Sequence, residues 1–328
     1  MSDPKERVKN RALIKRLNGK TKFNISKNSQ ALGLSRQTIQ NKLNNLRDRQ
    51  IIKNFTININ PNIQPNNLKF VMLEIKTNPK EPKLVEELLK LPQLKMLDGI
   101  FGEFSLIALF IFKSSDEYYQ ILNEIDKIMA QSYFKKYQII ETIKVFKTNG
   151  IKLENSAVNS QFDLDKIDDL ILKILQERQG LKPISTYDVK HLINEQHKDI
   201  VLKHYKEGIS QPTVHNKIKK FERNGVILNY TINFCPRKLG FKGKYIVRIK
   251  PKDPSKYDIL ARKLEEKNEI TDLFRIGTQY GLFAIIRVKE IEDYGNFIRD
   301  LYDSEEIEDT FTNFILDEMK PYTNFIIY

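Results

Sequence analysis

The stretch SRQTIQNKLNNLRDRQIIKNFTININP runs from Ser35 to Pro61, and it returns from Ser210 to Pro236 as SQPTVHNKIKKFERNGVILNYTINFCP. Of these 27 positions, 10 are identical. In both copies the apolar residues recur three and four positions apart, as they do along one buried face of a helix. The chain therefore contains an internal duplication, and each repeated stretch begins with a helix. The residues on the expected buried face are Ile39, Leu43 and Leu46 in the first copy and Val214, Ile218 and Phe221 in the second.

The opposite face of each of these helices carries polar side chains that can donate hydrogen bonds to phosphates and to the edges of bases. We therefore predict a DNA recognition helix in each copy. The candidate DNA-binding residues of the first are Ser35, Arg36, Gln37, Thr38, Gln40, Asn41, Lys42, Asn45 and Arg47. Those of the second are Ser210, Gln211, Thr213, His215, Asn216, Lys217 and Lys220.

The segments around each recognition helix predict a winged helix-turn-helix, in which two helices and a short turn precede the recognition helix and a two-stranded wing follows it. The first copy fits this order over residues 1–61, with helices expected at 5–18 and 24–32. The second fits it over residues 162–236, with helices at 164–176 and 186–194. An insertion at about 195–209 either lengthens the second turn or adds a helical turn. The wing signals are IIKNFTIN and VILNYTIN.

Each winged helix-turn-helix is followed by a segment with the order strand, helix, strand, strand, helix, strand, which is the ferredoxin-like plan. We assign residues 62–147 and 237–328 to these two domains, and the Asn- and Ser-rich segment 148–161 to a flexible linker. The fold class is α+β by tandem duplication. Since helices cover one face of each sheet, the two sheets of one chain can cover each other's open faces. The apolar tail at 323–328 could add a strand.

The net charge of +13 is concentrated at one end of the chain. Residues 1–60 hold 14 lysines and arginines against 3 acidic residues, a net charge of +11, whereas the segments 61–160, 161–235 and 236–328 carry +1, +2 and −1. A generally basic protein would spread this excess. A positive field confined to the first predicted helix-turn-helix instead indicates a module that binds a polyanion such as double-stranded DNA.

The sequence argues against several other classes of protein. No apolar run approaches the ~20 residues of a membrane span, and the N-terminus lacks the apolar core of a secretory signal, so we expect a cytoplasmic protein with no membrane partner. Cys235 is the only cysteine and cannot form an intrachain disulfide. The spacing of His191, His197 and His204 does not predict a metal site, and no catalytic or phosphate-binding motif is present. We expect no cofactor and no enzymatic activity.

The combined pattern resembles the Lrp/AsnC family of prokaryotic transcription regulators, here in a tandem form that covers nearly the whole chain. The segments that carry the resemblance are LDKIDDLILKILQ at 164–176, the stretch 33–61, GVILNYTINFCPRKLGF at 225–241, and the glycine segments GIFGEFSLIALF at 99–110 and RIGTQYGLFAII at 275–286. The resemblance implies that the ferredoxin-like sheets pack together, so that one tandem chain imitates a dimer. It also allows further self-association through these domains.

The resemblance implies, in addition, a small-molecule effector pocket beside the glycine segments. This sequence departs from the family pattern, because Ser105 stands where the family typically has an acidic residue and Gly277 is followed by an extra residue. The glycines can therefore serve either as tight-turn positions or as part of an effector pocket, and both interpretations stay open. The candidate effector residues are Gly102, Glu103, Ser105, Gly277, Thr278 and Gly281.

Two alternatives share this architecture. Siroheme decarboxylases resemble the same combination of domains and act as pairs, but every histidine of this chain lies in the second predicted winged helix-turn-helix. The other alternative is an assembly protein whose helix-turn-helix domains do not contact DNA. A DNA-binding regulator remains the main prediction, because the charge, the helix spacing and the repeat point to one surface.

Overall fold

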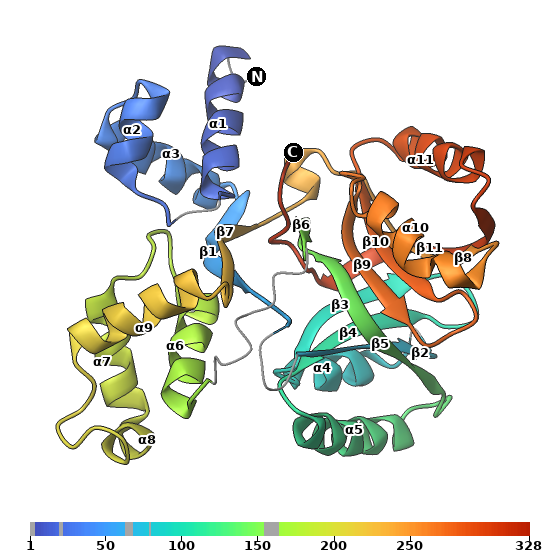
Figure 1. The fold of residues 1–328 in the computed structure, drawn as a ribbon, viewed down its shortest axis with the longest axis horizontal. Helices are drawn as coiled ribbons and strands as arrows, with labels where there is room; N and C mark the ends of the chain where they lie inside the picture. Colours follow the sequence, from blue (N-terminus) through green and yellow to red (C-terminus); the bar gives the residue numbers. More distant parts are fainter. Residues whose placement is uncertain (1–3, 20–21, 63–67, 79, 154–163) are drawn as a thin grey trace. The chain divides into compact units, whose positions relative to one another are not determined.

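The computed structural model describes residues 4–19, 22–62, 68–78, 80–153 and 164–328 (Figure 1). The chain divides into two compact units that each draw on both copies of the repeat. Unit 1 comprises residues 1–65, 156–239 and 326–328, and unit 2 comprises residues 66–155 and 240–325. We call residues 4–153 the first half and residues 164–328 the second half. In the described part of the chain no helix is long and apolar enough to cross a membrane.

Unit 1 contains the helices of both predicted helix-turn-helix domains. Polar residues cap their starts: Asn24, Ser35, Ser185 and Ser210 each accept a hydrogen bond from a backbone N–H of the first turn. The insertion in the second half adds a short helix, α8. The helices are α1 (Pro4–Leu17), α2 (Ile25–Leu32) and α3 (Arg36–Asp48) in the first half, and α6 (Lys166–Glu177), α7 (Thr186–Gln196), α8 (Lys198–Leu202), α9 (Gln211–Arg223) and the 3-10 helix η1 (Arg237–Leu239) in the second.

The predicted two-stranded wings are wrong. Each half supplies one uninterrupted strand, β1 (Ile52–Ile59) and β7 (Ile227–Phe234), and the two strands pair antiparallel with each other. The stretch of eight residues in each copy holds no glycine or proline at which a hairpin could turn. Ile57 of β1 is fully buried in the hydrophobic core of the second half's helices. The two helix-turn-helix domains are therefore joined by a shared sheet.

Unit 2 repeats the order strand, helix, strand, strand, helix, strand that the sequence predicts. In the first half these elements are β2 (Lys69–Ile75), α4 (Pro82–Lys90), β3 (Leu94–Ile100), β4 (Leu106–Phe112), α5 (Ser115–Ala130) and β5 (Tyr137–Thr148), followed by β6 (Ile151–Lys152). In the second half they are β8 (Gly243–Pro251), η2 (Pro254–Lys256), α10 (Tyr257–Leu264), β9 (Ile270–Ile276), β10 (Leu282–Val288), α11 (Ile291–Asp303) and β11 (Ile307–Lys320).

The strands of both halves form one continuous hydrogen-bonded sheet in the order β2-β4-β3-β11-β8-β10-β9-β5-β6, and a further pairing of β2 with β5 closes the ring. The long strands β5 and β11 make this possible. Each pairs with its own half along its first residues and with the other half along its last residues. Figure 1 shows the green β5 alongside teal strands of the first half and orange strands of the second half.

Three hydrophobic cores stabilise unit 2. One lies between α4, α5 and the first half's strands, and another between α10, α11 and the second half's strands. The third combines inward-facing residues of both halves, among them Phe70, Met72, Phe274 and Phe283. Alternating strand residues point to opposite faces of a sheet, so each half divides its apolar residues between its helices and the other half.

The segment 148–161 is only partly as predicted. Thr148 and Asn149 are buried, and the backbone N–H of Asn149 donates to the Asp272 carboxylate at 2.9 Å. Residues 148–153 are therefore structured, and residues 154–161 of the predicted linker lie outside the described residues. The tail forms no strand. The Ile327 N–H instead donates to the Asn18 side chain in unit 1 at 2.8 Å.

Candidate nucleic-acid interface

Helix α3 begins at the predicted position and buries the predicted face. The Ser35 hydroxyl accepts a hydrogen bond from the Thr38 N–H at 3.0 Å, which fixes the start of the helix. Ile39, Leu43 and Leu46 are all buried. The residues of the polar face are therefore turned outward by the packing of the apolar stripe. Of the candidate residues, Ser35, Arg36, Gln37, Asn41, Asn45 and Arg47 are exposed, and Thr38, Gln40 and Lys42 are half-buried.

The polar face of α3 is partly ordered by its own hydrogen bonds. The Gln37 amide donates to Asn41 at 3.0 Å, one helical turn away, and the Gln40 amide donates to Asn44 at 3.3 Å. The Lys42 ammonium donates to the Asn10 side chain of α1 at 2.9 Å. The ordered carboxamides have the chemistry to make paired hydrogen bonds with adenine.

Helix α9 repeats this arrangement in the second half. The Ser210 hydroxyl accepts from the Thr213 N–H at 3.2 Å, and Val214, Ile218 and Phe221 are buried. The Gln211 amide donates to the Thr186 hydroxyl of α7 at 3.2 Å. Of the candidate residues, Ser210, Gln211, His215, Asn216 and Lys220 are exposed, and Thr213 and Lys217 are half-buried.

Lys217 has surroundings unlike those expected of a residue that contacts DNA. Its ammonium lies 2.7 Å from a carboxylate oxygen of Asp165 and 2.7 Å from one of Asp168, both at the start of α6. Burial favours the neutral amine, but the hydrogen bonds to these two carboxylates outweigh it and raise the pKa of Lys217. The charge of Lys217 is therefore neutralised within the protein, whereas the sequence analysis assigned this residue to DNA.

A groove of about 520 Å³ lies beside α3, the first predicted recognition helix, within unit 1. Its α3 wall consists of Gln40, Asn44 and Arg47. The opposite wall belongs to the second half, where the α6–α7 connection contributes the cations of Arg178 and Lys182. These two residues were missed by the sequence analysis, although the basic, glycine-containing stretch ERQGLKP was a usable signal. The groove gives α3 additional positive charge from the other half of the chain.

Contacts of β1 hold the two helix-turn-helix domains of unit 1 together at this groove. The Phe55 N–H donates to the Gly180 carbonyl at 2.9 Å, and the Thr56 hydroxyl donates to the Gln176 carbonyl at 2.8 Å. From the first half's loop, the Lys22 ammonium donates to the Ile184 carbonyl at 2.9 Å. Each bond joins the first half to the end of α6 or to the connection that follows it.

The two glycine segments of unit 2 differ in how their space is filled. Gly281 has a left-handed backbone (φ +73°), and a Cβ added there would collide with the side chains of Arg275 and Tyr257. These side chains stack, with the guanidinium carbon 3.5 Å from the ring centroid. The space beside Gly281 is therefore filled by these two side chains. Gly277 and Thr278, in the same turn, are exposed.

The first glycine segment is more open. Gly102 is exposed, with a left-handed backbone (φ +140°) and nothing within 4 Å of an added Cβ. Hydrogen bonding to Lys136, 2.7 Å away, lowers the pKa of the exposed Glu103. The Ser105 hydroxyl donates to the Thr77 carbonyl at 3.1 Å. The charged and hydroxyl groups of this turn are thus engaged with neighbouring strand ends.

The histidines do not gather with metal-ligating residues. His191 lies 2.9 Å from the Glu195 carboxylate, one helical turn away on the surface of α7. Across the described ranges, no group of three or more His, Cys, Asp or Glu side chains is arranged to hold a metal ion.

Comparison with known proteins gives both family and fold relationships. The family model described as "Lrp/AsnC ligand binding domain" matches residues 245–325. The HTH-type transcriptional regulator FL11 of Pyrococcus furiosus is 30% identical over 160 residues, which are 49% of this chain and 94% of that protein. The HTH-type transcriptional regulator Ptr1 of Methanocaldococcus jannaschii is 34% identical over 91 residues, 28% of this chain and 61% of that protein.

A solved structure matches almost the full length of the chain. The siroheme decarboxylase NirDL has a TM-score of 0.61, with 95% of this chain and 92% of that chain covered. It has also been solved in complex with an iron-uroporphyrin III analogue. The sequence identity is 12%, so this likeness concerns the fold alone.

Proposed function

The chain belongs to the Lrp/AsnC family of HTH-type transcriptional regulators, and from this we propose that it is a sequence-specific DNA-binding regulator whose two halves act as a pseudo-dimer within one chain. The observation that carries the proposal is the polar face of α3. It exposes Arg36, Gln37 and Asn41 on a helix with a fixed start, within a segment of net charge +11. Phosphate contacts supply affinity and carboxamides read bases.

Two shared structures support the intrachain pseudo-dimer. In unit 1, β1 and β7 pair, and Ile57 of the first half is buried in the second half's core. In unit 2, β5 and β11 each pair with strands of both halves, and one hydrophobic core combines residues of both. Neither half can bury these apolar residues alone. The domain boundaries at 61, 161 and 236 are part of this proposal.

The two halves are proposed to read DNA unequally. On the second recognition helix, Lys217 is neutralised by two carboxylates. Beside the first, the groove adds the cations of Arg178 and Lys182 to the recognition surface. We therefore propose that the first half dominates affinity and that the recognised site is asymmetric. A protein of this kind would act in the cytoplasm.

Control by a small molecule is a further part of the proposal, because the matching family model is that of a ligand binding domain. The first glycine segment is the better candidate, since Arg275 and Tyr257 occupy the space at Gly281 in the second. Self-association between chains through the outer surfaces of unit 2 is compatible with this arrangement.

The experiment that tests the proposed function is an electrophoretic mobility shift at low salt with random-sequence duplex DNA and the full-length chain. Retardation that falls steeply as salt rises supports DNA binding. Absence of retardation at low salt would contradict it and would favour an assembly protein.

The fold likeness to NirDL favours a second candidate, a siroheme-decarboxylase-like activity. A titration of the chain with siroheme, followed by visible absorbance, tests this candidate separately. Saturable binding together with a decarboxylated product would support the enzyme and count against a regulator.

A further inference from the structure

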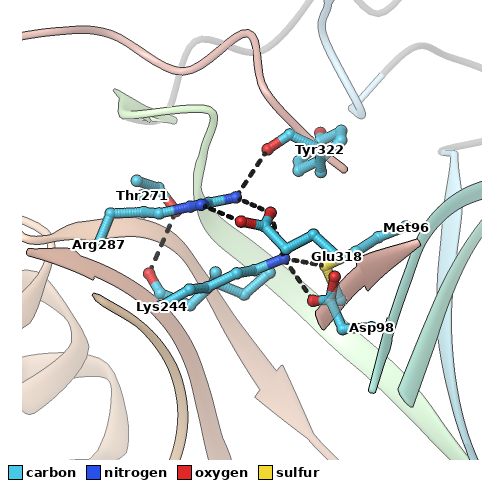
Figure 2. A network of polar contacts seen from close by, with 8 residues as sticks. Met96, Asp98, Lys244, Thr271, Arg287, Glu318 and Tyr322 are labelled. Carbon is cyan, nitrogen blue, oxygen red and sulfur yellow. Dashed lines mark hydrogen bonds and ion pairs between the residues drawn. The ribbon is translucent and has the colours of Figure 1, made fainter. Parts of the chain in front are cut away.

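The interface between the first and second halves in unit 2 contains a group of buried charges (Figure 2). Lys244 of the second half forms an ion pair with Asp98 of the first half, and its ammonium lies 3.5 Å from the Glu318 carboxylate. Arg287 donates to Glu318 at 2.8 Å. The Asp98 side chain is 0% exposed and the Lys244 and Arg287 side chains are each 3% exposed. We call these four residues the buried charge cluster.

The strand registers show which residue of one half corresponds to each cluster residue of the other half. Asp98 lies opposite Ile107 in the β3–β4 pair, and the matching pair of the second half places Phe274 opposite Phe283. The position equivalent to Asp98 is therefore Phe274. Glu318 of β11 lies opposite Asp98, and Val145 of β5 lies opposite Phe274. Since Asp98 and Phe274 are equivalent, Val145 is the equivalent of Glu318.

The two basic residues of the cluster also have apolar equivalents. Lys244 lies opposite Arg287 in the β8–β10 pair. In the β2–β4 pair of the first half, the same register places Phe70 opposite Ile111. The sheet interface is thus asymmetric. One end buries four charges, and the equivalent end consists of Phe70, Ile111, Val145 and Phe274.

A second pair of residues carries opposite charges at equivalent positions. Glu74 lies opposite Ile107 in β2, and Arg248 lies opposite Phe283 in β8, so the two are counterparts in the repeat. They form an ion pair with each other across the interface between the halves. Their side chains are 3% and 12% exposed. In a pairing of two identical halves, the same two places would hold two glutamates or two arginines.

Pairing of identical halves would also break the buried charge cluster. Two first halves would surround Asp98 with the equivalents of its present partners, which are Phe70, Ile111 and Val145. Two second halves would place Phe274 where Lys244 now meets Asp98, so Lys244 would lose this ion pair and keep only the longer contact of 3.5 Å with Glu318 within the cluster. A buried charge without a partner strongly destabilises a protein, whereas a buried pair adds little to stability over apolar residues. Consistent with this balance, burial raises the pKa of Asp98 despite the neighbouring Lys244.

We propose that the Glu74–Arg248 pair and the buried charge cluster form a pairing code that commits each half of the chain to a half of the other type. The code admits the two halves of one chain and rejects pairs of identical halves from different chains. This inference rests on the intrachain pairing proposed above and does not depend on DNA binding. Registry is the best-attested role of buried polar groups.

The test uses full-length chains with Glu74→Arg, with Arg248→Glu, and with both changes. Each single change places like charges face to face inside every chain, and we expect the folding equilibrium constant to fall by about 100-fold. The double change restores an opposite pair and should recover most of this loss. Urea unfolding monitored by circular dichroism measures the equilibrium.

Mixing the two single variants is the decisive step. When they are unfolded and refolded together, the arginine introduced at position 74 of one chain can meet the glutamate introduced at position 248 of the other, and the wild-type pair forms at the second interface. We expect the mixture to regain stability and native mass spectrometry to detect a species that contains one chain of each variant. If the double variant and the mixture both stay as unstable as the single variants, the code is wrong.

The ion pair of Lys69 and Glu141, 3.4 Å apart, provides a matched control because both residues belong to the first half. Exchange of halves between Lys69→Glu and Glu141→Lys chains cannot reunite complementary charges, so their mixture should show no recovery. Recovery in this control would overturn the assignment. A wild-type chain found only as exchanged two-chain species would contradict the intrachain pairing and leave the code intact.

Discussion

The Lys217 ammonium of α9 lies 2.7 Å from the Asp168 carboxylate at the start of α6. The positive charge of Lys217 is neutralised by the start of α6, so it adds little to the field of the second recognition helix. The contribution of each half to DNA binding is therefore separately testable.

Replacement of Arg36 by alanine should weaken DNA binding and lower the salt slope of the binding constant by about 0.9, the value expected for one lost phosphate contact. Replacement of Lys217 should leave the slope unchanged, because its charge is already compensated. Filter binding at salt concentrations from about 50 to 300 mM measures both slopes. Over this range the binding constant of a protein with several phosphate contacts falls by roughly 10³-fold or more. Equal losses of slope would contradict the asymmetry.

Replacement of Gln37 or Asn41 by alanine should relax sequence preference, with a loss of about 1–3 kcal/mol of discrimination at individual base pairs. The two side chains are exposed and hydrogen-bonded to each other at 3.0 Å, so they present ordered carboxamides. Gln30→Ala, at an exposed position of α2 that is not among the candidate DNA-binding residues, is the control for general effects on the helices. Binding-site selection with each variant measures the preference, and unchanged discrimination would show that α3 contacts only the backbone of DNA.

Replacement of Ile57 by alanine should destabilise the second helix-turn-helix although the residue belongs to the first half. The side chain is 0% exposed and lies in the core built from α6, α7 and α9. Removal of a buried isoleucine side chain to alanine typically costs about 2–5 kcal/mol. Hydrogen exchange of the α6 and α9 amides measures the effect. If only α1 to α3 lose protection, the shared core is wrong.

Lys147 should make stability depend on pH in the alkaline range. Burial lowers its pKa to about 8 from the usual 10.5, and its ammonium donates to the Lys267 carbonyl at 2.8 Å. Between these two pH values the unfolded chain binds more protons than the folded chain, so this residue makes the free energy of unfolding rise with pH. Below about pH 8, Lys147 is charged in the folded chain, and the cost of burying this charge lowers the free energy of unfolding by its full amount.

Replacement of Lys147 by methionine removes this titration. Relative to the variant, the wild type should gain about 1–3 kcal/mol in the free energy of unfolding between pH 8 and 10.5. Urea unfolding of both proteins at about pH 7, 8.5 and 10 gives the difference in their free energies of unfolding across the roughly 2-unit window of the titration. A flat difference curve would mean that Lys147 is not desolvated in the folded chain.

Periodicity predicted most of the local structure. The helices expected at 24–32 and 164–176 occur as α2 (Ile25–Leu32) and α6 (Lys166–Glu177), because apolar spacing reports directly on which face of an element is buried. It does not report which strand pairs with which. The same alternation in IIKNFTIN suits a hairpin wing and a strand that pairs with a distant copy, so β1 and β7 were misassigned.

The candidate site was predicted less completely than the fold. Exposure of Arg36, Gln37 and Asn41 follows from the buried stripe of α3 and could be read from the sequence. The neutralisation of Lys217 could not, because Asp168 is 49 residues away and meets it only through the packing of α6 on α9. Arg178 and Lys182 lie beside α3 because β1 binds the end of α6 and the connection that follows it. A wing within the first half would not make these contacts.

The central claim is that one chain reads an asymmetric DNA site with two unequal recognition helices. Selection of binding sites from a random duplex library by the full-length chain, followed by hydroxyl-radical footprinting on the winning sequence, tests it most directly. We predict one enriched, non-palindromic sequence, with the stronger protection abolished by Arg36→Ala. Enrichment of no sequence, or of a palindrome protected equally on both sides, would contradict it.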